Sequence, residues 1–178
     1  PDPVLKEIAQ PVDKIDDDVR AQMEGMLQAM YDAPGIGLAA NQVGLLNRVL
    51  VMDLSNRQMN EEKAPICMAN PEVVWQSEAL SQMEEGCLSI PGQYAEVERP
   101  AEVKVKYWDK NGEEQLLEAD GLLSHCVQHE IDHLKGKLYV DLISNKEQNT
   151  TKFNKNTLSP LSGSEPKYEP HRWNTKNN

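Results

Sequence analysis

The chain has 178 residues and a mass of 20.0 kDa, the size of one domain whose core needs no disulfide or structural metal. Residues 144–178 hold 6 of the 18 basic and 3 of the 29 acidic side chains, so residues 1–143 carry 12 and 26, a net charge of −14 that argues against direct binding of nucleic acid. Three irregularly spaced cysteines, no apolar run of membrane-spanning length and no signal-like segment predict a cytoplasmic protein without membrane association.

The apolar pattern predicts an early helix, several short strands and a late helix. The early helix is predicted over 16–31, with aspartates at its start and an apolar face formed by Val19, Met23, Met26, Leu27 and Met30. Strands are predicted over 48–54, 66–74, 103–107 and 114–118. Asn111-Gly112 predicts a two-residue hairpin turn between the last two. The late helix is predicted over 120–136, with protein covering two of its three faces.

This order of elements predicts an α+β fold, in which antiparallel strands pack around the central late helix. Residues 1–143 are predicted to form the folded domain. Residues 144–178 are rich in Asn, Lys, Thr, Ser and Pro, which predicts a polar tail that is poorly ordered or draped over the surface. The segment 35–44, taken alone, is an ordinary glycine-rich turn, because its glycines do not match a dinucleotide fingerprint.

The late helix carries the strongest chemical signal in the sequence. Two histidines four residues apart, His129 and His133, lie on one helix face and can bind one metal ion, while Glu130 can act on a water at that ion. His125 lies eight residues before His133, about 12 Å along the axis, so one ion cannot bind all three histidines. The alternative for this pattern is an ordinary exposed helix face.

A metal held by two imidazoles needs at least one more protein ligand. Cys126 lies roughly one turn from His129 and is better suited to a pocket wall, whereas Cys87 follows a glycine in a turn and could be aimed inward. An acidic ligand stays open, and a lone cysteine is more often a small buried hydrophobe. With Cys87 as third ligand, the fourth position is free for a water whose hydroxide attacks a carbonyl, and Glu130 transfers its proton to a leaving amine.

Three segments together resemble the signature motifs of the peptide deformylase family: GIGLAANQ at 35–42, EGCLS at 85–89 and QHEIDHL at 128–134. The resemblance covers roughly residues 1–142. It implies removal of the formyl group from the initiator formylmethionine of new polypeptides, with release of formate. It also implies a monomer that meets nascent chains and the ribosome, and one divalent metal, with Fe(II) as the physiological ion and zinc or nickel able to replace it.

Carried over by position, the resemblance implies three groups of site residues. The metal ligands are Cys87, His129 and His133. The catalytic residues are Glu130 for proton transfer, with the Gln42 amide and the Leu88 backbone N–H for the oxyanion. The substrate-binding residues are Ile36, Gly37, Glu85, Gly86, Leu122, His125 and Cys126. Arg99 and Asp132 match a pair that braces the ligand helix. Two positions depart from the family pattern: His125 replaces an aliphatic residue, and Tyr94 replaces an arginine common in bacterial members.

Two other interpretations remain at this point. A zinc peptidase of the zincin type shares the His-Glu-x-x-His motif, but it takes a downstream His or Glu as third ligand where this chain offers Cys87. A catalytically weak family member would bind metal or a nascent chain without turnover. The presence of Glu130 and Gln42 argues against it, and the histidine at position 125 keeps it open.

Overall fold

The structure, a computed structural model, describes residues 2–143. Its larger sheet is antiparallel and has the order β1-β2-β3-β6-β7. The strands of this sheet are β1 (Gly37–Ala39), β2 (Val49–Met52), β3 (Ile66–Gln76), β6 (Val103–Trp108) and β7 (Glu114–Ala119). A separate antiparallel hairpin consists of β4 (Leu80–Cys87) and β5 (Ile90–Pro100). Short 3-10 turns are η1 (Pro3–Lys6), η2 (Ala40–Val43), η3 (Arg57–Met59) and η4 (Tyr139–Asp141).

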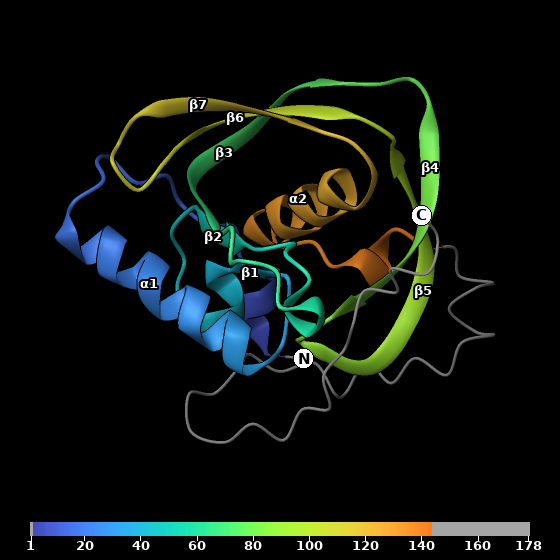
Figure 1. Cartoon of the computed structure of the whole chain (residues 1–178), viewed down its shortest axis with the longest axis horizontal. Coiled ribbons are helices and arrows are strands. Elements are labelled where there is room, and N and C mark those ends of the chain that lie inside the picture. Colours follow the sequence, from blue (N-terminus) through green and yellow to red (C-terminus); the bar gives the residue numbers. More distant parts are fainter. Residues whose placement is uncertain (1, 144–178) are drawn as a thin grey trace.

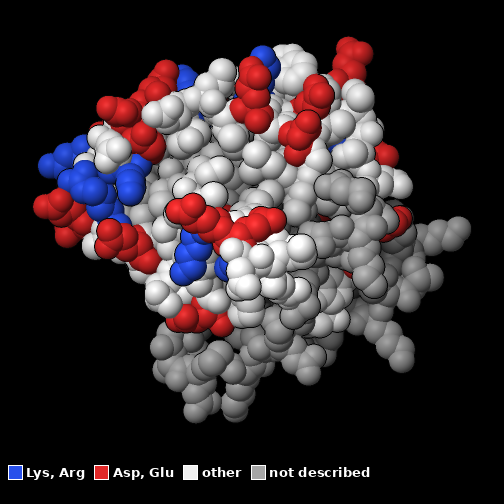
Figure 2. All heavy atoms as spheres, in the orientation of Figure 1, with Lys and Arg blue, Asp and Glu red and all other residues white. Residues whose placement is uncertain are grey.

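The helix α2 (Gly121–Leu134) lies between the larger sheet and the β4–β5 hairpin, and α1 (Asp17–Asp32) packs outside β1 and β2 (Figure 1). The predicted α+β fold with antiparallel strands around a central helix is therefore confirmed. The predicted tail, 144–178, lies outside the described residues. Figure 2 shows acidic and basic side chains intermixed over one face of the molecule. Among residues 2–143, no helix is long and apolar enough to cross a membrane.

The helix α1 forms as its apolar spacing predicts. The side chain of Asp16 caps it by accepting a hydrogen bond from the backbone N–H of Val19 at 3.0 Å. Its inner face packs on β1 and β2, and the buried side chains of that face are Val19, Met23, Met26 and Met30. This helix holds β1 in place, and β1 carries Gly37 of the predicted site.

Two predictions for the strands were wrong or incomplete. The β6–β7 connection spans 109–113, and within it Gly112 alone has a positive φ, so Asn111-Gly112 is not a two-residue turn with both residues left-handed. The Asp109 carboxylate accepts the backbone N–H groups of Asn111 and Glu113 and closes this longer loop. The glycine-rich segment 35–44 also contains a strand, β1, and the sequence pattern did not predict the β4–β5 hairpin.

The helix α2 matches its predicted range but is more deeply buried than expected. The third face, which was expected to stay uncovered, includes Ser124 and Gln128, and both are buried. The Gln128 amide donates to the carbonyl of Pro100 at 3.0 Å and to the Ser124 hydroxyl at 2.9 Å, so the end of β5 covers this side too. The helix ends before Gly136, which has a φ of 69°, a conformation that favours glycine. A Cβ at this position would also clash with the carbonyl of Lys6.

Candidate metal centre

The end of the hairpin strand β4 brings Cys87 against the two histidines of α2. The Cys87 Sγ lies 3.3 Å from His133 Nε2, which lies 3.2 Å from His129 Nε2. The three ligand atoms all lie within 4.8 Å of one another, and all three residues are buried. Because His129 and His133 are four residues apart on one helix, their rings lie on one face of α2. Cys87, at the end of β4, approaches that face.

This cluster fits a metal ion. Bond lengths of about 2.0–2.1 Å to nitrogen and about 2.3 Å to sulfur place the ligand atoms of a tetrahedral ion roughly 3.3–3.6 Å apart. The distances from His133 Nε2, 3.2 and 3.3 Å, are close to this spacing. One thiolate and two imidazoles are a donor set that zinc, iron and nickel all accept.

Glu130 directs a carboxylate into the same space. Its Oε2 is buried and has no hydrogen-bond partner among the described residues. Its Oε1 lies 2.5 Å from where a Cβ at position 37 would be, so the backbone of β1 can approach this carboxylate only because residue 37 is glycine. A buried carboxylate oxygen without a partner beside three metal-ligand atoms is suited to receive a proton from a water there.

Glu85 lies behind one of the two candidate ligand histidines. Its Oε2 accepts a hydrogen bond from His129 Nδ1 at 2.9 Å. The guanidinium of Arg99 donates to both oxygens of Glu85 and, at 2.8 Å, to Asp132 of α2. The predicted Arg99–Asp132 pair therefore forms, and through Glu85 it also reaches His129. A carboxylate behind a ligand histidine fixes the orientation of its ring.

Burial and neighbouring charges set the pKa values in this cluster. Burial raises the pKa of Glu130 to about 7, an effect that His129 reduces and Glu85 increases. Burial alone would raise the pKa of Glu85, but hydrogen bonds from Arg99 and two histidines hold it well below its usual value. Burial, together with the charges of His129 and Arg99, lowers the pKa of His133, which favours the neutral imidazole that binds metal.

His129 differs from its neighbour. Burial acts to lower its pKa, but hydrogen bonds with Cys87 and Glu85 raise it well above the usual value. These hydrogen bonds favour a second proton on the ring. A metal ion that binds at Nε2 must displace that proton, as metal binding generally does.

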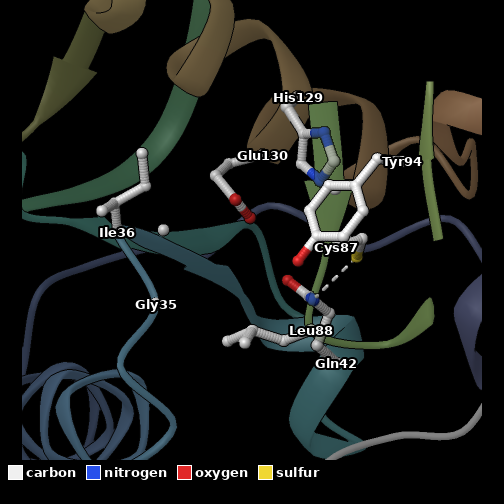
Figure 3. Close-up of a pocket in the computed structure, with 10 residues that line it drawn as sticks. Gly35, Ile36, Gln42, Cys87, Leu88, Tyr94, His129 and Glu130 are labelled. Atoms are coloured by element: carbon white, nitrogen blue, oxygen red, sulfur yellow. Dashed lines mark hydrogen bonds between the residues drawn. The ribbon is translucent and has the colours of Figure 1, made fainter. Parts of the chain in front are cut away.

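A hollow opens beside these residues (Figure 3). Its lining residues are Gly35, Ile36, Gly37, Gln42, Gly86, Cys87, Leu88, Tyr94, His129 and Glu130. The Gln42 side-chain oxygen accepts the backbone N–H of Ala39 at 2.9 Å, so its NH₂ group faces Cys87 Sγ at 3.5 Å and Ser89 Oγ at 3.2 Å. The amide is thereby held with its donors toward the cluster.

Four predicted substrate-binding residues lie outside this hollow. Cys126 is fully buried in the core between α2 and the larger sheet, and burial raises the pKa of its thiol. Leu122 is half-buried and lines a different surface hollow. Glu85 and His125 are both 0% exposed and bonded to each other, at 3.1 Å between Oε1 and Nδ1. The structure thus brings Ile36, Gly37 and Gly86 to the hollow, whereas the other four residues do not line it.

The family model described as Polypeptide deformylase matches residues 1–149. The chain belongs to the polypeptide deformylase family. It is 51% identical over 174 residues to the peptide deformylase of Methylocella silvestris, covering 96% of this chain and 88% of the relative. It is 56% identical over 144 residues to that of Rhizobium meliloti, covering 81% and 82%. The crystal structure of the Synechococcus elongatus peptide deformylase in complex with actinonin has a TM-score of 0.79 and 44% identity, covering 90% and 89%.

Two residues that line the hollow beside the cluster were not predicted as site residues. Gly35 lines the hollow, and it belongs to the first motif, so the motif itself was a signal for it. Tyr94 lines it as well, and its ring packs so closely on Gly86 that a Cβ there would lie 2.7 Å from the ring. The register of the hairpin pairs Gly86 with Tyr94, so this contact follows once β4 and β5 are known to be paired.

Proposed function

We propose that this chain removes the N-formyl group from newly made polypeptides by hydrolysis, and that Cys87, His129 and His133 hold the one divalent metal ion that the reaction needs. The reaction adds water across the formyl amide and yields formate and a free amine. The observation that carries this proposal is the meeting of one sulfur and two imidazole nitrogens, within 4.8 Å of one another, beside the unpartnered carboxylate of Glu130. Membership of the deformylase family supports it.

The residues around the cluster have complementary roles in this chemistry. When bound, the metal supplies Lewis acidity, which lowers the pKa of a coordinated water to about 7. Glu130 Oε2 accepts the proton of the attacking water and later gives it to the amine nitrogen as the C–N bond breaks. The NH₂ group of Gln42, held by the bond from Ala39, and the backbone N–H of Leu88 donate to the formyl oxygen as it becomes negative.

The residues that line the hollow support a peptide substrate. Its walls include the backbone of β1 at Gly37 and of β4 at Gly86, and an extended formyl peptide would pair with them as an added strand. The first side chain of the substrate, methionine, would lie against Ile36. Tyr94 narrows this space from the hairpin side.

We also propose the physiological setting. Fe(II) is the proposed metal in the cell, and zinc or nickel would occupy the same three ligands. The proposed partners are N-formylmethionyl nascent chains as they leave the ribosome, and the proposed form is a cytoplasmic monomer. The net charge of −11 argues against a direct role for nucleic acid as ligand.

The direct test uses the full-length protein, purified under anaerobic conditions and loaded with ferrous iron. Formyl-Met-Ala-Ser and acetyl-Met-Ala-Ser are offered in parallel, and free amine is measured. We expect amine from the formyl peptide and none from the acetyl peptide. An absence of amine from both would refute the proposal, and internal cleavage of a longer peptide would favour the peptidase.

Glu130→Gln tests the role of the carboxylate. The amide has the same shape but cannot accept the proton, so turnover of the formyl peptide should fall by about 10²–10⁴-fold. Metal content, measured on the same preparation, should stay at that of the unchanged chain because Glu130 is not among the three ligands. Substantial residual turnover with full metal content would show that another group takes the proton.

A further inference from the structure

The histidine at position 125 is fully buried, and both nitrogens of its ring are hydrogen-bonded. Its Nε2 lies 2.7 Å from the hydroxyl of Ser81, and its Nδ1 lies 3.1 Å from Glu85 Oε1. The side chain is 0% exposed and does not line the hollow beside the metal ligands. If this side chain only filled space, an apolar residue would give a more stable fold, because a buried polar ring lowers stability unless it is hydrogen-bonded.

The bonds of Glu85 decide where the protons are. Each of its oxygens accepts two hydrogen bonds, Oε1 from Arg99 Nε and His125 Nδ1, and Oε2 from Arg99 Nη2 and His129 Nδ1. An ionised carboxylate only accepts, so His125 carries a proton on Nδ1, and in the neutral ring Nε2 then accepts the hydrogen bond of the Ser81 hydroxyl. By the same argument His129 carries a proton on Nδ1, and its Nε2 is the nitrogen that faces the metal cluster.

We propose that His125 is a positioning residue for the metal ligand His129, acting through Glu85, with Ser81 fixing the orientation of the His125 ring. The inference rests on the proposed function, because it takes His129 to be a metal ligand. Arg99 approaches Glu85 along one edge, and the two histidines fill the remaining acceptor position of each oxygen. Without His125, one of the four acceptor positions of a buried carboxylate is empty, and the carboxylate can turn toward a different partner.

The hydrogen-bonded series runs from the protein surface to the metal cluster. Ser81 is half-buried and lines a surface hollow near the start of α2, and it is the cross-strand neighbour of Arg99 in the hairpin. From there the series passes through His125 and Glu85 to His129. The four side chains come from β4 and α2, so the series also ties these two elements together.

The test is the metal affinity of the full-length chain, measured with zinc in competition with a chromophoric chelator. Four variants separate the bonds of the ring. In His125→Asn the amide nitrogen takes the place of Nδ1 and can still donate to Glu85, whereas in His125→Gln it takes the place of Nε2 and reaches only Ser81. His125→Leu removes both bonds, and Ser81→Ala removes only the outer one.

We expect the zinc dissociation constant to rise by about 10–100-fold in His125→Leu and His125→Gln, as for other partners of ligand histidines. His125→Asn should recover most of this loss, and Ser81→Ala should show the smallest change. Cobalt added in place of zinc gives a second readout, because its visible absorption reports the geometry of the ligands. His125→Leu and His125→Gln should change that spectrum, and the spectrum of His125→Asn should match that of the unchanged chain.

Two results would overturn the inference: zinc binding by the Leu and Gln variants equal to that of the unchanged chain, or binding by Asn as weak as that by Leu. The second result would mean that packing rather than the donated bond matters. If Leu does not fold, as judged by thermal unfolding of the metal-free chain, the comparison of Gln with Asn decides. An unchanged chain that binds no zinc would refute the proposed function itself, a different outcome from equal binding by all chains.

Discussion

The two helices are buried in opposite ways. In α1 the buried side chains are all apolar: Val19, Met23, Met26 and Met30. In α2, ten of fourteen residues are buried, and six of these ten are polar: Ser124, His125, Gln128, His129, Glu130 and His133. Apolar burial has no direction, whereas buried polar groups need partners at fixed distances. The buried face of α1 can therefore pack on any apolar surface of suitable shape, whereas the buried polar groups of α2 need hydrogen-bond partners from particular side chains of other elements.

The hairpin β4–β5 supplies most of those partners. It contributes Cys87 to the metal cluster, Glu85 to both His125 and His129, and Arg99 to Glu85 and Asp132. The helix α1 supplies no residue to the hollow beside the cluster. Changes in α1 should therefore alter stability alone, whereas changes where the hairpin meets α2 should alter stability and metal binding together.

The largest effect is expected from Arg99→Leu. Arg99 is 5% exposed, and its loss leaves the buried carboxylate of Glu85 without its charged partner, which should lower the free energy of unfolding by about 3–5 kcal/mol. Urea unfolding of the metal-free chain measures it. The matched control is Lys104→Met, which breaks the exposed pair with Glu118 and should cost about 1 kcal/mol or less. If both variants lowered the free energy of unfolding equally, the buried polar contacts of α2 would be no more important to stability than an exposed ion pair.

The apolar helix is tested at Met30, which is fully buried against β1 and β2. Met30→Ala leaves a cavity and should lower the free energy of unfolding by about 2–5 kcal/mol. Met30→Leu keeps the volume and should cost less than about 1.5 kcal/mol. Both variants should keep the deformylation rate per folded molecule. A loss of rate in Met30→Leu would mean that α1 influences the site directly.

Local patterns were enough to predict the helices. The methionine spacing of α1 and the His129–His133 spacing of α2 are each contained within one helix, so periodicity alone gives their ranges and faces. The strands β2, β3, β6 and β7 were also predicted from local patterns, such as the short apolar run of β2 and the alternation of apolar and charged residues in β6. For the site, the same locality placed two histidines and Glu130 on one face before any other element was known.

Contacts between distant segments could not be predicted in this way. The hairpin β4–β5 carries many glutamates, and its tight reversal at Cys87–Ile90 has no Asn-Gly signal. The buried state of Gln128 depends on Pro100, 28 residues away, and that of His125 depends on Ser81 and Glu85, 44 and 40 residues away. The resemblance assigned His125 to the substrate, whereas in the structure its ring is bonded to Ser81 and Glu85 and does not line the hollow beside the cluster. No local period contains that information.

The smallest effect is expected at Tyr31, where α1 makes a directional hydrogen bond, and it tests the contrast between the two helices most closely. Tyr31 donates from its hydroxyl to the carboxylate of Asp53 at 2.6 Å, and Asp53 is 0% exposed. Tyr31→Phe removes this charge-assisted bond and should lower the free energy of unfolding at pH 7 by about 1.5–3 kcal/mol. Tyr107→Phe is the control, because among the described residues the Tyr107 hydroxyl makes no hydrogen bond, and it should change stability less.

The effect of Tyr31→Phe should also depend on pH, with a defined sign. Burial acts to raise the pKa of Asp53, but hydrogen bonds from Tyr31, Ser55 and Ala64 hold it below its usual value. A carboxyl whose pKa is lower in the folded chain contributes stability above the unfolded pKa of about 3.9, and that contribution is lost as pH falls through the folded pKa. The difference between the two chains in urea unfolding should thus be full at pH 7 and shrink below about pH 4. A difference that stays constant down to low pH would mean that Tyr31 stabilises the chain by packing, as the methionines of α1 do, and not through the charge of Asp53.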